Sequence, residues 1–224
     1  MISHFTLNKK INLTPDVYWL QFIPNGSVKA PIEGQFLTFL LPKSGGRAYS
    51  ILNYDGKHFE FIIKRLESGR WGSKEICDLS IGEEIKWIWP SGHFVLKETP
   101  KNKLFLGTGT WFAPLYFQIL WASQKELKCD LKFVFWVREQ KDMFYEKELE
   151  RITHHHPNFS YEIYLSQEKL ENYNFWRITS FISKDSIQGF EEFYICGSPS
   201  MVEDAERLLL ENGAHTEQIF TEKY

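Results

Sequence analysis

The sequence predicts two domains, a barrel of antiparallel β-strands over residues 1–99 and an α/β domain with a parallel sheet over residues 100–224. Three observations lead to this fold class. The 224 residues suffice for two domains of about 100 residues each. Short strand-like segments separated by turns fill the first part of the chain. In the second part, apolar segments alternate with helical patterns.

The barrel is predicted from segments that are rich in β-branched and aromatic residues. Turn clusters such as Pro24-Asn25-Gly26 and Asp55-Gly56 separate these segments, as is typical of an antiparallel barrel. A helix is expected over residues 73–79, with Ser73 as its N-cap. The expected strands cover residues 17–23, 35–41, 47–53, 59–66 and 85–89.

The second domain follows a polar stretch at residues 99–103, which is the expected linker. Beyond it, strand and helix patterns alternate, which implies a parallel sheet with helices on both faces. Ser200 and Glu203 have the spacing of a capping box at the start of the last helix. The expected strands are 104–106, 131–137, 161–165, 193–196 and 218–222, and the expected helices are 112–125, 145–152 and 201–212.

Composition excludes several classes of protein. A net charge of −3 gives no strong field for nucleic acid or anionic lipid. The odd, widely spaced Cys77, Cys129 and Cys196 favour a reducing cytoplasm and exclude a four-cysteine iron–sulfur cluster held within this chain. Neither a signal peptide nor an apolar run of roughly 20 residues is found. We expect a cytoplasmic monomer with no metal site, and an exposed loop at residues 154–156.

Two short segments carry groups that suit a flavin nucleotide. In residues 47–50, the fork of Arg47 suits a pyrophosphate, the ring of Tyr49 can stack on a flavin, and the hydroxyl of Ser50 can bond its nitrogen edge. Residues 69–73 form a glycine-rich turn before a helix, which suits phosphate. Each segment alone is also compatible with an ordinary strand or an ordinary capped helix.

Taken together, the motifs of the chain resemble those of the ferredoxin–NADP reductase family. They occur in the family's order and cover nearly the whole sequence. The resemblance implies an FAD-binding β-barrel followed by a Rossmann-like NAD(P)-binding domain. The matching segments are Arg47-Ala48-Tyr49-Ser50, Ile63-Lys64, Gly72-Ser73, Gly82, Pro90-Ser91-Gly92-His93-Phe94, Gly107-Thr108-Gly109, Ala113-Pro114, Cys196-Gly197-Ser198-Pro199-Ser200-Met201 and Glu222-Lys223-Tyr224.

The resemblance also implies roles for single residues. Residues of the first domain would hold FAD through its phosphates, its ring and backbone contacts: Arg47, Tyr49, Ser50, Ile63, Lys64, Gly72 and Ser73. The catalytic position for hydride transfer would be formed by Ser50, Cys196, Glu222 and Tyr224, the last of which would cover the second flavin face. The nicotinamide nucleotide would be bound by Gly107, Thr108, Gly109, Pro114, Arg138, Gly197 and Tyr224.

The nucleotide half departs from the family at two places. Trp111 stands where the plant-like members have a glycine, so its indole either reshapes the pyrophosphate site or points into the core. Gln167 stands where NADP-preferring members often have an arginine, and a neutral amide cannot give a charge-assisted bond to a 2′-phosphate. Lys169 and Arg177 lie nearby and offer substitutes. The choice between NADP and NAD therefore stays open.

The expected activity is an FAD-dependent reductase that moves electrons between NAD(P)H and a one-electron carrier. Ferredoxin, flavodoxin or an oxygenase component would be the partner. Two alternatives remain: an NAD(P)H-flavin reductase that releases its flavin, and a flavin-bearing electron-transfer subunit with impaired nicotinamide binding. Trp111 keeps the second alternative open. Lysines and arginines of the first domain could meet an acidic partner, although a charged, solvated surface is the plainer explanation.

Overall fold

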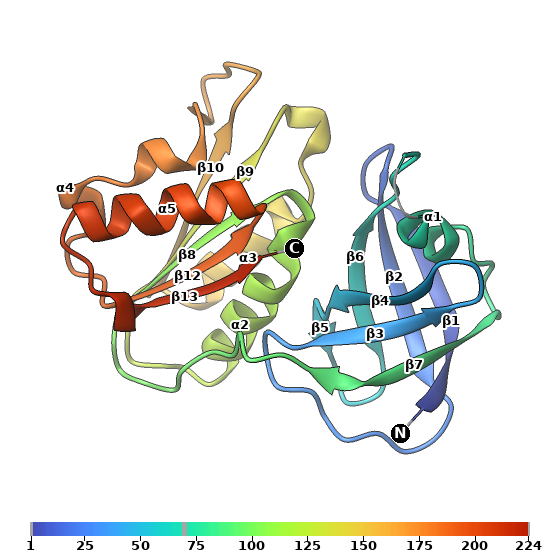
Figure 1. The fold of residues 1–224 in the computed structure, drawn as a ribbon. Coiled ribbons are helices and arrows are strands. Elements are labelled where there is room, and N and C mark those ends of the chain that lie inside the picture. The colour runs from blue at the N-terminus through green and yellow to red at the C-terminus, as the bar shows by residue number, and fades with distance from the viewer. Residues whose placement is uncertain (1, 69–70, 224) are drawn as a thin grey trace. The chain divides into compact units, whose positions relative to one another are not determined.

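The computed structural model describes residues 2–68 and 71–223 and divides into two compact units (Figure 1). Unit 1 is Met1–Leu96 and unit 2 is Lys97–Tyr224. Each unit contains a single main sheet, antiparallel in unit 1 and parallel in unit 2. The predicted fold class is confirmed. None of the helices in the described part of the chain has the length and apolar character needed to cross a membrane.

The sheet of unit 1 has the strand order β4-β3-β7-β1-β2-β6-β5, and every neighbouring pair is antiparallel. One short helix lies between β6 and β7. The elements are β1 (Ile2–Asn12), β2 (Val17–Pro24), β3 (Phe36–Leu41), β4 (Gly45–Ser50), β5 (Asn53–Tyr54), β6 (Phe59–Lys64), α1 (Gly72–Cys77) and β7 (Glu84–Ser91).

Aromatic side chains fill the core of unit 1. Phe5 stacks on Trp87 with a centroid distance of 4.4 Å, and Phe22 lies 5.3 Å from Phe39. All four rings are fully buried. Much of the high aromatic content of the chain therefore stabilises the barrel rather than contacting a ligand.

The helix of unit 1 begins one residue earlier than predicted and has a different N-cap. Trp71, with φ 63°, is the cap residue and supplies no side-chain bond. The hydroxyl of Ser73 instead accepts a hydrogen bond from the backbone N–H of Leu66 at 3.1 Å. At the other end, the ammonium of Lys10 donates to the carbonyls of Cys77 and Leu79. A cation there complements the helix dipole, and the helix ends at Cys77.

Unit 2 contains a parallel sheet with the order β11-β10-β9-β8-β12-β13. The chain runs outward from β8 to β11 and then returns to β12 on the other side of β8. The elements are β8 (Lys103–Thr108), η1 (Gly109–Trp111), α2 (Phe112–Gln124), β9 (Leu131–Val137), η2 (Gln140–Asp142), α3 (Glu146–His155), β10 (Phe159–Leu165), β11 (Asn174–Phe175), η3 (Ile178–Phe181), α4 (Lys184–Ile187), β12 (Glu192–Gly197), α5 (Pro199–Glu211), η4 (Thr216–Gln218) and β13 (Ile219–Lys223).

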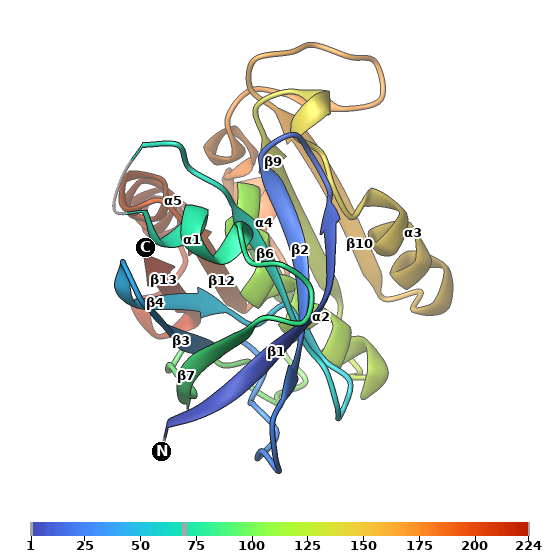
Figure 2. The same cartoon turned by 90° about the vertical axis from the view of Figure 1, so that its right-hand side faces the viewer.

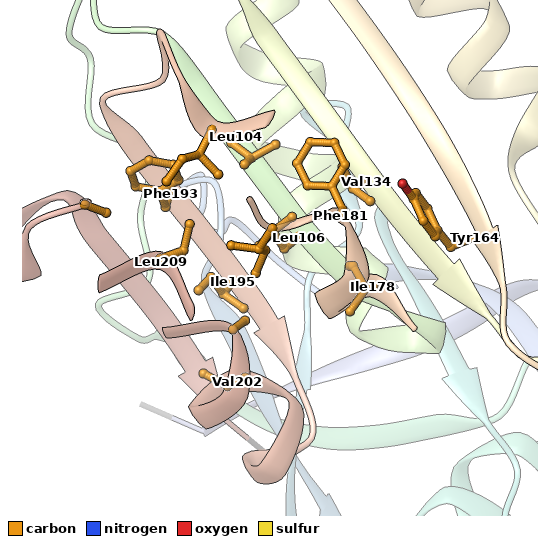
Figure 3. Packing of buried hydrophobic residues seen from close by; sticks show 14 residues of the cluster. Leu104, Leu106, Val134, Tyr164, Ile178, Phe181, Phe193, Ile195, Val202 and Leu209 are labelled. Carbon is orange, nitrogen blue, oxygen red and sulfur yellow. The ribbon is translucent and has the colours of Figure 1, made fainter. Parts of the chain in front are cut away.

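Helices cover both faces of this sheet (Figures 1 and 2). On one face, Leu106 and Ile195 pack in one buried cluster with Val202 of α5 (Figure 3). On the other face, the ring of Phe112 at the start of α2 lies 5.6 Å from that of Phe133 in β9. Successive residues of a strand point to opposite faces, so strands buried on both sides are apolar throughout.

A buried ion pair closes the amino edge of the sheet. Lys103 and Glu192 are the first residues of β8 and β12, both are buried, and their charged atoms lie 3.3 Å apart. The ammonium of Lys103 also donates to the carbonyls of Thr99 and Lys101, and the hydroxyl of Tyr194 donates to Glu192. These bonds satisfy both charges inside unit 2.

Two local predictions for unit 2 were wrong. The last helix is capped by Ser198, whose hydroxyl accepts from Met201 N–H at 3.4 Å, and Pro199 takes the first helical position that proline favours. The proposed box of Ser200 and Glu203 therefore lies inside the helix. Residues 154–156 are not a loop, because α3 extends to His155 and His156 caps it.

Candidate functional site

In unit 1, Arg47 of β4 crosses the start of α1. A Cβ atom at Gly72 would lie 2.6 Å from Cγ and 2.8 Å from Nε of Arg47, so any larger residue would displace the arginine. The guanidinium also donates to the Gly46 carbonyl at 2.7 Å. The missing side chain at Gly72 thus lets a cation lie against a helix start, an arrangement that fits a pyrophosphate.

Tyr49 and Ser50 complete β4 next to this arginine. The ring of Tyr49 is half-buried and lies 5.9 Å from that of Phe39 in the barrel core. Burial, and next the neighbouring Cys77, raise the pKa of Tyr49, so the phenol stays neutral. Ser50 is also half-buried and pairs with Phe36 across the sheet. A neutral ring and a hydroxyl at a strand end fit the flat, polar-edged ring of a flavin.

The remaining predicted flavin residues have structural partners. Ile63 is buried, and Lys64 forms an ion pair with Asp16 at 2.8 Å. This ion pair engages the ammonium of Lys64, and the backbone contacts to FAD that the resemblance implies for Ile63 and Lys64 stay a prediction. The hydroxyl of Ser73 is likewise engaged with Leu66 N–H. The structure thus brings Arg47 and Gly72 into direct contact, while Lys64 and Ser73 use their side chains to hold the fold.

In unit 2, the glycine turn after β8 is built by close packing. A Cβ at Gly107 would meet Leu115 at 2.7 Å, so Gly107 lets α2 pack directly on the strand. Gly109 has φ +52° and faces open space. Pro114 is buried in the first turn of α2, where proline needs no hydrogen-bond partner. Gly107 and Pro114 are therefore packed inside the unit and fix the turn. Gly109 is the glycine of the turn that faces open space.

The ends of β8 and β12 approach each other closely. A Cβ at Gly197 would lie 2.7 Å from the sulfur of Met201 and 3.1 Å from the hydroxyl oxygen of Thr108. The chain leaves β8 for α2 on one face and β12 for α5 on the other. Such a switch point leaves a crevice at the carboxyl edge of a parallel sheet, where ligands bind in open α/β folds.

A cavity of about 420 Å³ lies at this edge. It is lined by residues that end strands β8, β9, β10 and β12 and by the helices that follow. They are Thr108, Trp111, Trp136, Arg138, Ser166, Gln167, Arg177, Ile178, Thr179, Ser198, Ser200, Met201 and Asp204. The cavity therefore brings together residues from five separate segments of unit 2.

Two arginines give the cavity its charge. Arg138 and Arg177 are both exposed, and neither forms a salt bridge with another residue in the described ranges. Trp111 lines the cavity, so the alternative in which it points into the core is wrong; the neighbouring Phe112 is fully buried instead. Lys169 does not line the cavity. The cations that the structure offers to phosphate are thus the two arginines.

Cys196 and Glu222 lie side by side on β12 and β13, as the paired strands place them. Cys196 also pairs with Gly107 on its other side. Burial, and next the Glu222 carboxylate, raise the pKa of the Cys196 thiol well above its usual range. The fully buried thiol is therefore neutral and not a nucleophile at neutral pH. The predicted partner Tyr224 and the turn residues 69 and 70 lie outside the described residues.

Sequence reasoning missed several residues of the cavity. Trp136 lies within the apolar run of β9, where nothing in the pattern separates it from core residues. Thr179 and Asp204 lie on η3 and α5, and no motif of the sequence includes either residue. Their position after a strand could have indicated them, because residues that directly follow parallel strands lie together at the carboxyl edge of the sheet.

Comparison with known proteins finds similarity to reductase and electron-transfer components. Residues 105–207 match the family model of the oxidoreductase NAD-binding domain. One component of the Na(+)-translocating NADH-quinone reductase from Methylococcus capsulatus is 28% identical over 200 residues, which are 80% of this chain and 49% of that protein. The toluate 1,2-dioxygenase electron transfer component of Pseudomonas putida is 26% identical, over 86% of this chain and 58% of that protein. The chain spans about half the length of these relatives.

Solved structures share the fold over the full chain. The cytochrome P450 reductase GcoB of Amycolatopsis has a TM-score of 0.91 at 22% identity and covers 100% of this chain, which matches 69% of it. A ferredoxin NADP+ reductase from Neisseria gonorrhoeae, with bound FAD and NADP, has a TM-score of 0.86 at 20% identity over 99% of this chain and 98% of its own.

Residues 105–207 therefore match an oxidoreductase NAD-binding domain, and the relatives named above are reductase or electron-transfer components. The fold over the whole chain is the two-domain fold of ferredoxin–NADP reductase-like proteins, which agrees with the resemblance seen in the motifs. The comparisons also support the predicted cofactors, FAD and a nicotinamide nucleotide.

Proposed function

We propose that this chain is an FAD-dependent reductase that transfers electrons between NAD(P)H and a one-electron carrier. The observation that carries the proposal is the cavity of about 420 Å³ at the carboxyl edge of the parallel sheet, lined by Arg138 and Arg177. Two cations beside a glycine turn suit the phosphates of a dinucleotide, and the cavity has the size of a ligand pocket, roughly 300–1,000 Å³.

FAD is assigned to unit 1, residues 1–99 in the predicted division. Arg47 would bind its pyrophosphate, because the absence of a side chain at Gly72 lets the arginine lie against the start of α1. The neutral Tyr49 ring would pack on the flavin, and the hydroxyl of Ser50 would bond its nitrogen edge. When bound, the flavin supplies the chemistry, since it exchanges electron pairs with nicotinamide and single electrons with carriers.

The nicotinamide nucleotide is assigned to unit 2, residues 100–224 in the predicted division. Thr108 and Gly109 would approach its pyrophosphate at the switch point, and Arg138 with Arg177 would neutralise its phosphates. Cys196 would position the ring as a neutral neighbour rather than exchange a proton, because its thiol pKa is raised. The resemblance implies that Glu222 and Tyr224 would lie beside the nicotinamide ring.

The acceptor is assigned from the chemistry of the relatives. Besides the toluate dioxygenase component, the propane 2-monooxygenase reductase component of Rhodococcus jostii is 29% identical over 75% of this chain. A ferredoxin, a flavodoxin or an oxygenase component is therefore the proposed partner. Cys77, Cys129 and Cys196 are all free and buried, which fits the reducing cytoplasm expected from the sequence.

Two other functions make different predictions for the purified protein. A flavin reductase would bind its flavin weakly and be isolated colourless. An electron-transfer subunit that has lost nicotinamide binding would be yellow but would not react with NAD(P)H. The observation that favours this function is that Trp111 lines the cavity.

Absorbance in the flavin bands separates these functions. The full chain is purified and its spectrum is recorded without oxygen, before and after addition of NADPH and, separately, NADH. A yellow protein that either nucleotide bleaches supports the reductase. A yellow protein that neither nucleotide bleaches identifies the electron-transfer subunit, and a colourless protein identifies the flavin reductase.

A further inference from the structure

The hairpin of β3 and β4 carries Arg47 at the edge of the sheet of unit 1. In the strand order, β4 is an outer strand whose ladder partner is β3. All six residues of β4 are exposed or half-buried. A strand with so little buried apolar surface is weakly held by packing and opens more easily than a core strand. Polar contacts around the hairpin therefore matter for the position of Arg47.

One carboxylate joins this hairpin to α1. Glu75 lies in the first turn of α1 and is half-buried. Its Oε1 accepts the backbone N–H of Lys43 at 2.9 Å, and its Oε2 accepts the N–H and the hydroxyl of Ser44 at 3.0 and 2.6 Å. Lys43 and Ser44 lie in the turn between β3 and β4, which runs beside α1 (Figures 1 and 2). These three bonds are named the Glu75 bridge below.

The carboxyl group of Glu75 is ionised at neutral pH. Burial opposes its charge, but the hydrogen bonds from Ser44 and Lys43 outweigh this cost and hold the pKa of Glu75 below its usual range. Hydrogen bonds to an ionised acceptor are roughly twice as strong as those between neutral groups. The Glu75 bridge is therefore a firm connection between the hairpin and the helix.

The Glu75 bridge and Arg47 meet α1 on the same face. Gly72 and Glu75 are three residues apart in α1, a spacing that puts them on one side of a helix. Arg47 lies against Gly72, where a Cβ atom would be 2.6 Å from its Cγ. Ser44 precedes Arg47 by three residues, which span about 10 Å of strand. Hairpin and helix are thus joined at two nearby points, and loss of one frees the other to move.

We propose that Glu75 is a positioning residue, whose bridge to the β3–β4 turn holds Arg47 against Gly72 for the pyrophosphate of FAD. This inference rests on the proposed function and adds to it a residue that acts through Arg47. A side chain that is already held in its binding position loses less freedom when the ligand arrives. Without the Glu75 bridge, Arg47 should still be present but should bind phosphate less well.

The test is a double-variant cycle with Arg47. Spectroscopic titration of the full chain, freed of flavin, measures the dissociation constant of FAD for the wild type, Glu75→Ala, Arg47→Ala and the combined variant. Glu75→Ala alone should weaken FAD binding by about 3- to 10-fold. Added to Arg47→Ala, the same change should have no further effect, because no guanidinium is left to position. Glu75→Gln keeps one oxygen acceptor and should lie between the wild type and Glu75→Ala.

Asp55→Ala is the matched control for a purely structural role. The Asp55 carboxylate accepts the backbone N–H groups of Lys57 and His58 at 2.9 and 2.6 Å, within the turn between β5 and β6. Its loss removes the same kind of bond from another turn of unit 1. Asp55→Ala should therefore lower the melting temperature, as Glu75→Ala does, but leave the affinity for FAD unchanged.

The results that overturn the proposal differ in what else they refute. If Arg47→Ala weakens FAD binding but Glu75→Ala does not, or if the two losses are fully additive, Glu75 does not act through Arg47 and the assignment of FAD stands. If Arg47→Ala leaves the affinity unchanged, or the wild type does not bind FAD, the proposed flavin site fails together with the role of Glu75. An equal loss of affinity in Asp55→Ala would assign the effect of Glu75 to stability.

Discussion

The two edges of the parallel sheet in unit 2 use charged residues in opposite ways. At the amino edge, Lys103 and Glu192 are buried and bonded to each other and to neighbouring groups. At the carboxyl edge, Arg138 and Arg177 are exposed beside a cavity, and no salt bridge within the described ranges engages them. Charges of the first kind hold the fold, and charges of the second kind are available to a ligand.

The difference follows from the cost of moving charge out of water. A buried charge is tolerated only when partners replace its hydration, so Lys103 cannot be changed alone without leaving Glu192 unpaired. An exposed arginine keeps its hydration and has no desolvation cost to offset, so a phosphate can bind it with little rearrangement. Substitutions at the amino edge should therefore change the free energy of unfolding, whereas substitutions at the carboxyl edge should change ligand affinity.

Lys103→Met should have the largest effect. Removing one partner of a buried pair leaves an uncompensated carboxylate, which costs about 3–5 kcal/mol in the free energy of unfolding. Urea denaturation followed by circular dichroism measures this loss. The exposed Lys128→Met is the matched control and should stay within about 0.5 kcal/mol of the wild type.

A double variant separates the pair from its surroundings. Lys103→Met combined with Glu192→Met replaces both charges by apolar groups, so it should recover most of the stability lost in the single variant. If the free energy of unfolding of Lys103→Met lies within about 1 kcal/mol of the wild type, other groups compensate the charge of Glu192. The amino edge would then not differ from the carboxyl edge in how its charges affect stability.

Arg47→Ala tests the same contrast in unit 1, where a cation lies against Gly72. Losing a charge-assisted phosphate contact should weaken flavin binding by roughly 1.5–3 kcal/mol, or about 10- to 100-fold. Lys74→Ala, which removes an ion pair with Glu67, should change it by at most about twofold. Flavin retained after gel filtration is the readout, and equal retention by both variants would place Arg47 away from the phosphates.

Arg138→Ala and Arg177→Ala should each weaken nucleotide binding while leaving stability intact. Because both side chains are exposed, the expected loss is about 1 kcal/mol each, roughly fivefold in the dissociation constant. Arg151→Ala serves as the control, since Arg151 is exposed and pairs only with Glu148 of its own helix among the described residues. A change in melting temperature without a change in affinity would assign these arginines to the fold.

The difference between buried and exposed segments also explains which strands could be predicted from the sequence. Strands β8 and β9 are largely buried on both faces, so their apolar runs were found directly. Strand β1 was missed, because polar residues alternate with its inward Phe5 and Leu7 and a register shift between Leu7 and Lys9 breaks the pattern. The exposed Ile11 further hides the strand.

The candidate site was predictable where motifs mark it and obscure elsewhere. Arg47 and Gly72 were found from two motifs, and the structure adds that the two residues touch. Trp136 and Asp204 could not be found, because the cavity joins segments that are far apart along the chain. The buried pair of Lys103 and Glu192 was equally invisible, since each residue looks like a surface charge beside a turn.

The smallest expected effect concerns aromatic residues of the nicotinamide side. If Tyr224 covers the flavin, nicotinamide must compete with its stacked ring, which contributes about 0.5–1.5 kcal/mol beyond its buried area. Tyr224→Ser should then tighten NADPH and NADH binding by about 2- to 10-fold. Dissociation constants measured for both nucleotides, with Tyr161→Ser in β10 as a control outside the cavity lining, check this expectation.

Trp111→Gly sharpens the result, because the Trp111 indole occupies the wall of the cavity at the start of η1 and α2. In a working reductase the wild type binds nucleotide, and enlarging the cavity at Trp111 should alter its affinity only modestly. If instead Tyr224→Ser has no effect and Trp111→Gly creates binding that the wild type lacks, the indole blocks the site. The natural protein would then carry electrons on its flavin without taking them from nicotinamide, and the two arginines at the carboxyl edge would have no phosphate to bind.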